Sequence, residues 1–206
     1  MPQPDPNTPF EFTSSHLALD FANTADYRAG ECMKDRLTDY PRLLEWGIGS
    51  ATINQETGDR LLRLSRESPG TAQATLRRAL HLREAIFQLF SAVANRRGVP
   101  GSSLAVLNAA ARQASEHSQL EHANRRFLWR WVEPESSLDA MLWPVSRAAV
   151  DLLASEEVAF VRHCASENCD WLFLDTSKNH RRRWCDMKVC GNRDKARRYY
   201  RRQKAG

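Results

Sequence analysis

Four cysteines near the C-terminal end constrain this chain more than any other feature of its sequence. They form a C-x4-C-x15-C-x4-C array made of Cys164, Cys169, Cys185 and Cys190. Two cysteine pairs joined by a loop can close a tetrahedron of thiolates around one zinc ion, and structural zinc sites are commonly all-cysteine. A segment this short buries too little apolar surface to stay folded alone, so the metal would supply the missing free energy. We therefore predict one structural Zn²⁺ bound by these four residues.

Two alternatives exist for this array. Two disulfides could form instead, but disulfide frameworks are typical of small secreted chains, and this chain has 206 residues. His163 or His180 could replace a cysteine as ligand, but His163 adjoins Cys164, where both side chains can rarely reach one metal. Because four of the five cysteines fit one metal site better than a disulfide framework, cysteine usage favours a reducing, cytoplasmic compartment. The fifth cysteine, Cys32, is predicted to be a small core residue, and a redox sensor is the alternative.

The net charge of +5 hides a division of the chain into an acidic and a basic part. Residues 178–206 hold 12 Lys/Arg and 2 Asp/Glu, whereas the other 177 residues hold 18 and 23, which gives +10 against −5. This asymmetry predicts that the C-terminal part binds a polyanion while the rest has another task. No apolar run approaches the roughly 18 residues that span a bilayer, so no membrane partner is expected.

The basic residues around the cysteines are the predicted contacts to double-stranded DNA. Arg193 and Arg197 are the candidates for base recognition, because arginine can pair with guanine through two hydrogen bonds. The same residues could instead bind RNA or an anionic membrane, or form a merely solvated tail. The predicted DNA-binding residues are Arg181, Arg182, Arg183, Lys188, Arg193, Lys195, Arg197, Arg198, Arg201 and Arg202.

A last helix is predicted from Asn192 or Arg193 to about Lys204. Asn192 suits the N-cap position, and Gly191 would let the chain turn tightly after Cys190. The many arginines of such a helix repel one another, and anchoring at the metal or screening by phosphates would relieve that repulsion. Earlier in this segment, Val158 to Val161 and Trp171 to Leu174 suit short strands. Four apolar residues are expected to form a small core beside the metal: Trp171, Leu172, Phe173 and Trp184.

The preceding part of the chain reads as mainly helical. The longest predicted helix covers Ala72 to about Asn95, where apolar residues recur at steps of three and four. Thr52 and Gln55 resemble a capping box that opens another helix. Arg126 to Val132 reads as a strand that pairs with Gln119 to Ala123 in a hairpin. A helix follows from Ser137, and Pro144 either kinks it or marks its true start.

The expected fold class is therefore mainly α (α+β), in three parts. Residues 1–9 form a disordered lead-in without the layout of a secretion signal. Residues 10–157, here called the body, form a helical domain with a small β-hairpin. Residues 158–206, here called the finger, form a small four-cysteine zinc module with a C-terminal basic helix.

Two stretches of the sequence resemble known families. The stretch from Cys164 to Cys185, together with Cys190-Gly191-Asn192-Arg193, resembles the CGNR zinc finger. The motif Leu17-Ala-Leu-Asp20-Phe21-Ala-Asn23-Thr24 resembles the ABATE domain that precedes this finger in bacterial proteins. The resemblance implies a bacterial, stress-responsive transcription regulator that binds DNA through the finger and senses an effector or dimerises through the body. It also implies the same four cysteines as zinc ligands.

The body offers candidate residues for an effector pocket: Asp20, Asn23, Thr24 and Arg83. Helix capping and internal hydrogen bonding are the alternative roles for the first three. One small finger reads few base pairs, so a homodimer is expected. An RNA-binding or ribosome-associated module remains an alternative function. An enzyme with a pocket in the body is another, with Asp20, Asp35, Arg83, His81, His117 and His122 as its generic candidates. However, no catalytic motif is present and four cysteines leave no open zinc position, so no enzyme is predicted.

Overall fold

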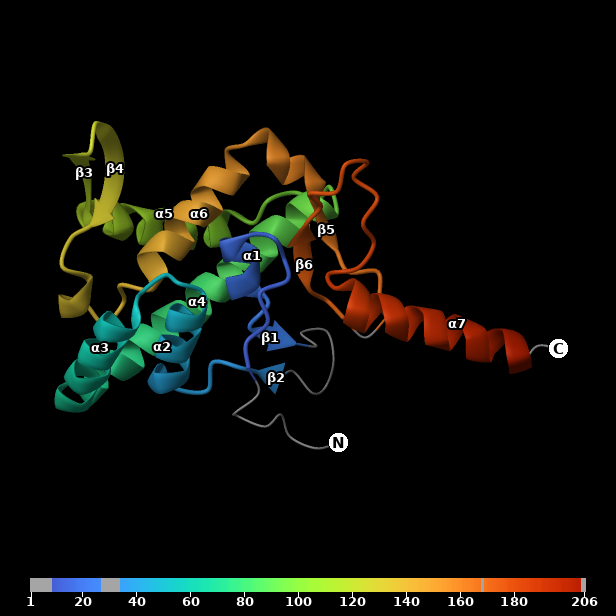
Figure 1. The fold of residues 1–206 in the computed structure, drawn as a ribbon, viewed down its shortest axis with the longest axis horizontal. Helices are drawn as coiled ribbons and strands as arrows, with labels where there is room; N and C mark the ends of the chain where they lie inside the picture. Colours follow the sequence, from blue (N-terminus) through green and yellow to red (C-terminus); the bar gives the residue numbers. More distant parts are fainter. Residues whose placement is uncertain (1–8, 27–33, 168, 205–206) are drawn as a thin grey trace.

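The computed structural model describes residues 9–26, 34–167 and 169–204 (Figure 1). The lead-in expected at residues 1–9, apart from Pro9, and Cys32 therefore lie outside the described residues. The side chain of Arg202 is also outside the description, although its backbone belongs to the last helix.

Helices build most of the body, as the sequence predicts. The long helix α4 runs through the middle of the body, and the others pack around it (Figure 1). Its apolar stripe buries Ala79, Leu82, Ile86, Leu89 and Phe90. No helix in the described part of the chain is both long and apolar enough to cross a bilayer. The body helices are α1 (Leu17–Ala22), α2 (Tyr40–Gly49), α3 (Gln55–Glu67), α4 (Pro69–Ala94), α5 (Gly101–Glu116) and α6 (Leu142–Leu153).

Several helix starts differ from the sequence prediction. The capping box at Thr52 is wrong, because Asn54 caps α3 by accepting a hydrogen bond of 2.8 Å from the backbone N of Thr57. α4 begins three residues earlier than predicted, at Pro69, because proline has no N–H to lose in a first turn. Pro144 lies in the first turn of α6, so it marks the start of that helix and does not kink it.

The strands form three separate antiparallel pairs in the described residues. β3 (Ser118–Ala123) and β4 (Arg126–Trp131) form the predicted hairpin, in register Ser118 with Trp131. Asn124 and Arg125 both have positive φ, as a two-residue turn of this kind requires. β1 (Ala25–Asp26) pairs with β2 (Lys34–Asp35), and β5 (Val161–His163) pairs with β6 (Leu172–Leu174). The strand predicted from Val158 is wrong, because residues Glu156–Phe160 form a 3-10 helix before β5.

The apolar core of the body extends into the finger. Val161 on β5 and Leu172 and Leu174 on β6 are buried in the same cluster as α1, α4 and α6. Leu172 was expected beside the metal, but alternation along β6 turns it toward the body and leaves Phe173 on the metal side. The prediction holds for Trp171, Phe173 and Trp184, which pack with the cysteines in a second, small cluster. The paired strands β5 and β6 therefore join the two cores.

Candidate metal centre

The backbone brings the four cysteines together from two short segments. Cys164 follows β5 and Cys169 precedes β6, so the first pair lies in the loop that joins these two strands. The N–H of Cys164 donates to the carbonyl of Trp171 at 2.8 Å, which extends the pairing of these strands by one bond. Cys185 ends a loop, and Cys190 lies in a one-turn π-helix formed by residues Met187–Gly191. Such π-helical turns occur often at functional sites.

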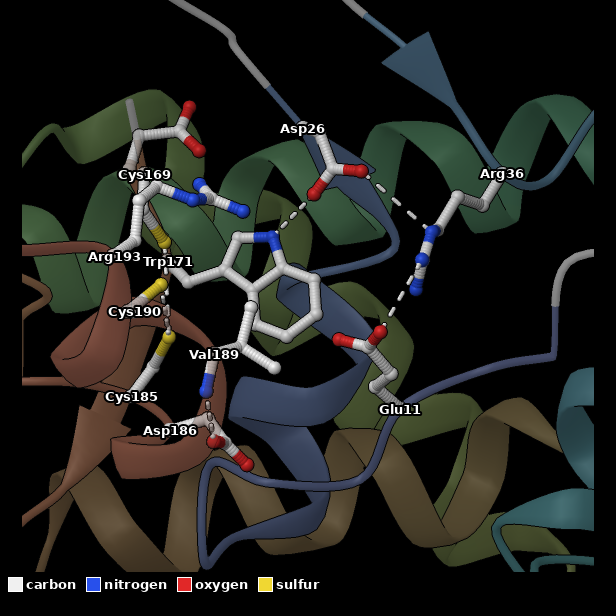
Figure 2. Close-up of a pocket in the computed structure, with 11 residues that line it drawn as sticks. Glu11, Asp26, Arg36, Cys169, Trp171, Cys185, Asp186, Val189, Cys190 and Arg193 are labelled. Atoms are coloured by element: carbon white, nitrogen blue, oxygen red, sulfur yellow. Dashed lines mark hydrogen bonds and ion pairs between the residues drawn. The ribbon is translucent and has the colours of Figure 1, made fainter. Parts of the chain in front are cut away.

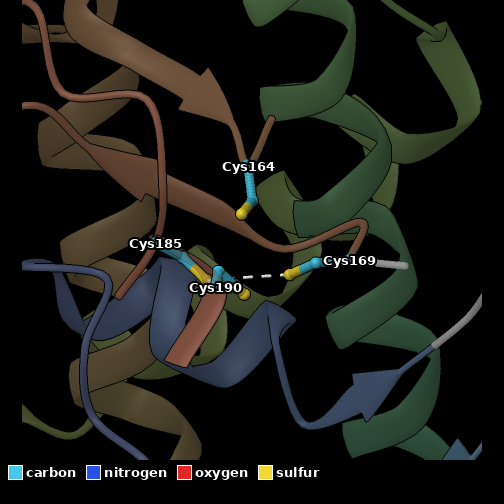
Figure 3. Close-up of side chains that lie close together, drawn as sticks. All are labelled: Cys164, Cys169, Cys185 and Cys190. Atoms are coloured by element: carbon cyan, nitrogen blue, oxygen red, sulfur yellow. Dashed lines mark hydrogen bonds between the residues drawn. The ribbon is translucent and has the colours of Figure 1, made fainter. Parts of the chain in front are cut away.

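The sulfur atoms have the spacing that a tetrahedral zinc site requires. All four lie within 4.8 Å of one another. Figure 3 shows the four side chains close together. The Sγ atoms of Cys169 and Cys185 are 3.6 Å apart, and those of Cys185 and Cys190 are 3.7 Å apart. Ligands at the usual Zn–S distance of about 2.3 Å would be separated by ~3.8 Å in a tetrahedron. The S–S bond of a disulfide is only about 2.05 Å long, and all four cysteines are free in the structure, which does not support the disulfide alternative.

Crowding gives the four thiols very different tendencies to ionise. Hydrogen bonds from Cys169 and Cys185 hold the pKa of the Cys164 thiol far below its usual range. The same contacts to Cys164 raise the pKa of both Cys169 and Cys185, and burial raises the pKa of Cys190. Four thiolates at this spacing therefore repel one another unless a cation lies between them. A divalent ion with a preference for sulfur supplies that compensation.

The second half of the site differs from its prediction in two details. Asn192 is not an N-cap, because the π-helix runs directly into α7 (Asn192–Lys204) and Asn192 has helical angles. Asp186 caps this combined helix instead, by accepting from the N–H of Val189 at 2.8 Å. The tight turn predicted at Gly191 is also wrong, since no glycine in the described residues has a positive φ. A Cβ on Gly191 would meet the Sδ of Met187 at 2.5 Å.

Neither candidate histidine reaches the metal site. The Nε2 of His163 lies 3.0 Å from Ser91 Oγ and 3.2 Å from Asn95 Nδ2, both at the end of α4. The ring of His180 stacks on Phe160 with centroids 3.7 Å apart. Burial lowers the pKa of His163, which favours a neutral ring between the finger and α4. The geometry therefore supports the all-cysteine ligand set.

The long loop between the cysteine pairs is organised by buried Asp175. Its carboxylate accepts hydrogen bonds from the backbone N and the hydroxyl of Ser177, and from the backbone N of Arg182 at 2.9 Å. Burial alone would raise the pKa of Asp175, but these donors lower it below the ordinary value. This network folds the loop back so that Cys185 meets the first pair.

Arg182 is the residue that departs furthest from its predicted DNA-binding role. Its guanidinium donates to the carbonyls of Trp184 at 2.9 Å and Thr13 at 2.8 Å, and also to the carbonyl of Cys185. It further contacts the hydroxyl of Ser15 at 3.1 Å. Because its donors are used inside the protein, Arg182 fastens the finger loop to the body.

Apart from Arg202, whose side chain is not described, the other predicted DNA-binding residues fall into two groups. Arg197 and Arg201 form ion pairs with Glu167, at 2.8 and 3.1 Å, and Arg198 pairs with Asp194 at 3.0 Å. Because Glu167 lies between the first two cysteines, its two ion pairs hold α7 against the loop that contains Cys164 and Cys169. The second group is exposed and forms no ion pair with a described acidic residue: Arg181, Arg183, Lys188, Arg193 and Lys195. Arg183 lies over the ring of Trp184, at 5.2 Å from its centroid.

The four residues proposed for an effector pocket are buried and occupied by internal contacts. Asp20 accepts from the backbone N of Ser14 at 3.0 Å, and burial raises its pKa. The hydroxyl of Thr24 donates to the carbonyl of Phe21 at 2.8 Å. Arg83 makes a two-point ion pair with Asp35, at 2.6 and 2.8 Å. These contacts are the internal roles that the sequence left open, and the effector pocket at these residues stays a prediction.

Asn23 has a role that sequence analysis missed. Its side-chain amide donates to the carbonyl of Leu172 at 2.8 Å, and its side-chain oxygen accepts from the N–H of Leu172 at 3.0 Å. The side chain therefore pairs with β6 as a neighbouring strand would, and it fixes the finger to the end of α1. The sequence signal was an asparagine in a short signature motif, but the partner lies 149 residues away.

A second link between body and finger surrounds Trp171. Its indole N–H donates to Asp26 on β1 at 2.5 Å, and Arg36 lies over its ring at 5.6 Å from the centroid. Figure 2 shows these side chains around a small cavity between the strands of the body and the metal site. The cavity measures about 170 Å³, and Asp186 and Arg193 also line it.

Comparison with known families agrees with this geometry. The family model ABATE, described as "Putative stress-induced transcription regulator", matches residues 15–156. The CGNR zinc finger model matches residues 161–203, which include all four cysteines. A search of curated proteins found no match. The finger match and the sulfur spacing together identify the cofactor as one structural Zn²⁺.

Proposed function

This chain belongs to the ABATE family, and we propose that it is a cytoplasmic transcription regulator whose zinc-folded finger binds double-stranded DNA. The family and the zinc finger are established by the two matching family models. The DNA target, the response of the body to an effector and the assembly of two copies are the proposal.

The observation that carries the proposal is the projection of α7 from the rest of the molecule. Figure 1 shows this helix extending away from the body, with its first turn at the metal site. The segment NRDKARRYYRRQK holds seven basic residues and one acidic residue. An exposed cationic helix fixed at one end can enter a groove of DNA without a clash from the body.

The exposed basic residues would make the phosphate contacts. Lys188 and Lys195 lie on the surface without a described acidic partner, as does Arg181 in the preceding loop. Arg197 was a candidate for base recognition, but its ion pair with Glu167 would have to open first. Arg193, at the start of α7, therefore remains the better candidate for a base contact. The exposed rings of Tyr199 and Tyr200 could stack against sugars or bases.

Two copies would be needed to read a useful length of DNA, and the hairpin offers a surface for the second copy. Phe127, Leu128 and Trp129 on β4 are exposed, and β4 pairs only with β3 among the described strands. If two β4 strands pair about a twofold axis between Leu128 and Trp129, Arg126 lies opposite Trp131 and Phe127 lies opposite Arg130. Each arginine then meets an aromatic ring, which is a favourable contact. We therefore assign this edge to self-association.

The test is a salt titration of DNA binding by the zinc-loaded full chain. Each phosphate contact contributes about −0.9 to the slope of log K against log salt. We expect Lys188→Ala and Lys195→Ala each to reduce that slope by about 1. Arg66→Ala removes an exposed charge from the body at α3 and serves as the matched control, with an unchanged slope.

Parallel titrations with duplex RNA and with single-stranded RNA separate the main alternative. Tighter binding to RNA at equal salt would favour an RNA-binding module. Absence of salt-dependent binding to any of the three nucleic acids would refute the proposal.

A further inference from the structure

Two arginines of α7 converge on a single carboxylate at the surface of the finger. Arg197 and Arg201 are four positions apart, so they project from the same side of the helix. The Nη1 of Arg197 lies 2.8 Å from one oxygen of Glu167, and the Nη2 of Arg201 lies 3.1 Å from the other. Like charges at this spacing on a helix repel each other unless an anion lies between them. The two arginines therefore form a binding site for one anionic group.

The neighbouring residues hold both sides of this anion site in place. Asp194 lies one turn before Arg197 and approaches its guanidinium at 3.5 Å, and the side chain of Arg197 is half-buried. On the other side, Glu167 lies in the loop before Cys169, whose N–H donates to the carbonyl of Ser166 at 3.0 Å. The arginines are therefore positioned by α7 and Asp194 as well as by Glu167, so they stay aligned when the Glu167 side chain moves.

The carboxylate of Glu167 can leave this site at little cost. Its side chain is 56% exposed and that of Arg201 is 66% exposed. Ion pairs between exposed side chains add little to stability, because water and salt screen them. Within the described residues, Glu167 forms ion pairs with Arg197 and Arg201 and with no other base. An anion from outside the protein that binds both arginines more strongly can therefore displace it.

A backbone phosphate of DNA matches the chemistry of this site. Like a carboxylate, it presents two oxygens and one negative charge to the guanidinium groups, which bind both kinds of anion through paired hydrogen bonds. A phosphate of duplex DNA has a further advantage over Glu167, because its neutralisation releases condensed counterions. That gain is absent when an internal carboxylate binds the same arginines. DNA is therefore the stronger of the two competitors.

We propose that Arg197 and Arg201 bind one backbone phosphate of DNA, and that Glu167 occupies this phosphate site as an internal competitor until DNA binds. In the complex, the Glu167 side chain turns outward and the phosphate lies between the two guanidinium groups. Arg193, four positions before Arg197, belongs to the same row, so its base contact uses the same side of α7. Glu167 therefore weakens binding to every DNA sequence alike. This inference rests on the proposed function, because it assigns one contact within it.

The test measures the affinity of the zinc-loaded full chain for duplex DNA at one fixed salt concentration. Glu167→Gln keeps the shape of the side chain and removes its charge. We expect this variant to bind DNA about 5-fold more tightly, a gain of the size that weak, exposed ion pairs allow. Glu156→Gln removes one negative charge from an exposed position before β5 and is the matched control. Because salt screens distant charges, the control should change the affinity by less than about 2-fold.

A double-mutant cycle separates local competition from a general effect of charge. The variant with both Arg197→Gln and Arg201→Gln should bind DNA more weakly, and its salt slope should fall by about 1, as the loss of one phosphate contact requires. When Glu167→Gln is added to that variant, we expect no further change in affinity, because the carboxylate no longer has a site to occupy. Zinc bound per chain is measured in every variant and should stay at one.

The inference is overturned if Glu167→Gln binds DNA no more tightly than the unmodified chain, or if it loses zinc, because the ion pairs would then be purely structural. It is also overturned if Glu156→Gln gives the same gain, or if the gain persists without the two arginines. Absence of DNA binding by the unmodified chain refutes the proposed function and this inference together. DNA binding without the predicted differences refutes the inference alone.

Discussion

The body and the finger are stabilised in different ways. The body buries a continuous apolar cluster around α4 that draws residues from every body helix. Around the metal site, the described residues of the finger form a second, small cluster of cysteines and aromatic rings. A cluster of that size cannot offset the entropy of ordering the long loop and α7. The comparison teaches that the body should fold by apolar burial alone, while the outer finger should fold only with its metal.

The part stabilised by apolar burial and the part stabilised by the metal do not meet at the sequence boundary between residues 157 and 158. β5 and β6 belong to the finger by sequence, but their inward residues Val161, Leu172 and Leu174 belong to the core of the body. Asn23 fixes β6 itself to the end of α1, while Arg182 and Trp171 hold the outer finger to the body through polar contacts. Metal loss should therefore melt the loop and α7 while the strand pair stays in place.

The largest expected effect is that of losing a zinc ligand. Cys185→Ser breaks the contacts of the most central sulfur, which lies next to both Cys169 and Cys190. Structural zinc contributes on the order of 10 kcal/mol to such modules, so the outer finger should unfold. We expect zinc per chain to fall from one to near zero and salt-dependent DNA binding to disappear. Thermal unfolding of the body, followed by circular dichroism, should remain cooperative.

The next largest effect tests the link at Asn23. Asn23→Ala leaves both the N–H and the carbonyl of Leu172 without their buried partner, at about 1–3 kcal/mol each. We expect the free energy of unfolding to fall by roughly 3 kcal/mol in urea denaturation. Asn108→Ala, at an exposed position of α5, is the control and should change it by less than about 0.5 kcal/mol. Equal losses in both variants would contradict the role of Asn23 as a link.

Variants of two neighbouring arginines distinguish a structural role from a contact with DNA. Arg182→Ala removes donors to Thr13, Trp184 and Cys185 and should destabilise the zinc-loaded protein by about 2 kcal/mol. Arg181→Ala removes an exposed charge, so it should leave stability unchanged and reduce the salt slope of DNA binding by about 1. The opposite pattern would return Arg182 to the DNA-contact group.

The smallest expected effects are those of a Gly→Ala substitution made once in the finger and once in the body. Gly191→Ala in the finger meets only the thioether of exposed Met187, which can move, and alanine favours a helix over glycine by about 1 kcal/mol. We expect a change of less than about 1 kcal/mol. Gly47→Ala in the body would bring its Cβ to 2.9 Å from the Cβ of buried Met141, and overpacking costs about 1–3 kcal/mol. Melting temperatures of the two zinc-loaded variants test this order.

Short-range patterns predicted much of this structure. The spacing of the cysteines, the apolar stripe of α4 and the alternating residues of β4 each depend on neighbours a few positions away. The sequence therefore indicated the zinc site, the central helix and the hairpin. Capping was less predictable, because Asn54 rather than Thr52, and Asp186 rather than Asn192, supplied the oxygen that meets the free N–H groups.

The long-range contacts could not be predicted from one sequence. Arg182 stands among other arginines in the chain, and nothing local distinguishes it from Arg181 or Arg183. Its role depends on carbonyls at Thr13 and Cys185, which only the fold brings together. The same holds for the pairing of Asn23 with Leu172.

Hydrogen exchange measured by mass spectrometry tests the central claim most directly, with the full chain in its zinc-loaded form and after chelation. We predict that chelation removes protection from residues 175–204, while α4, β5 and β6 keep theirs. Unchanged protection of α7 after the metal is gone would contradict the account, because the cationic helix would then be held without zinc.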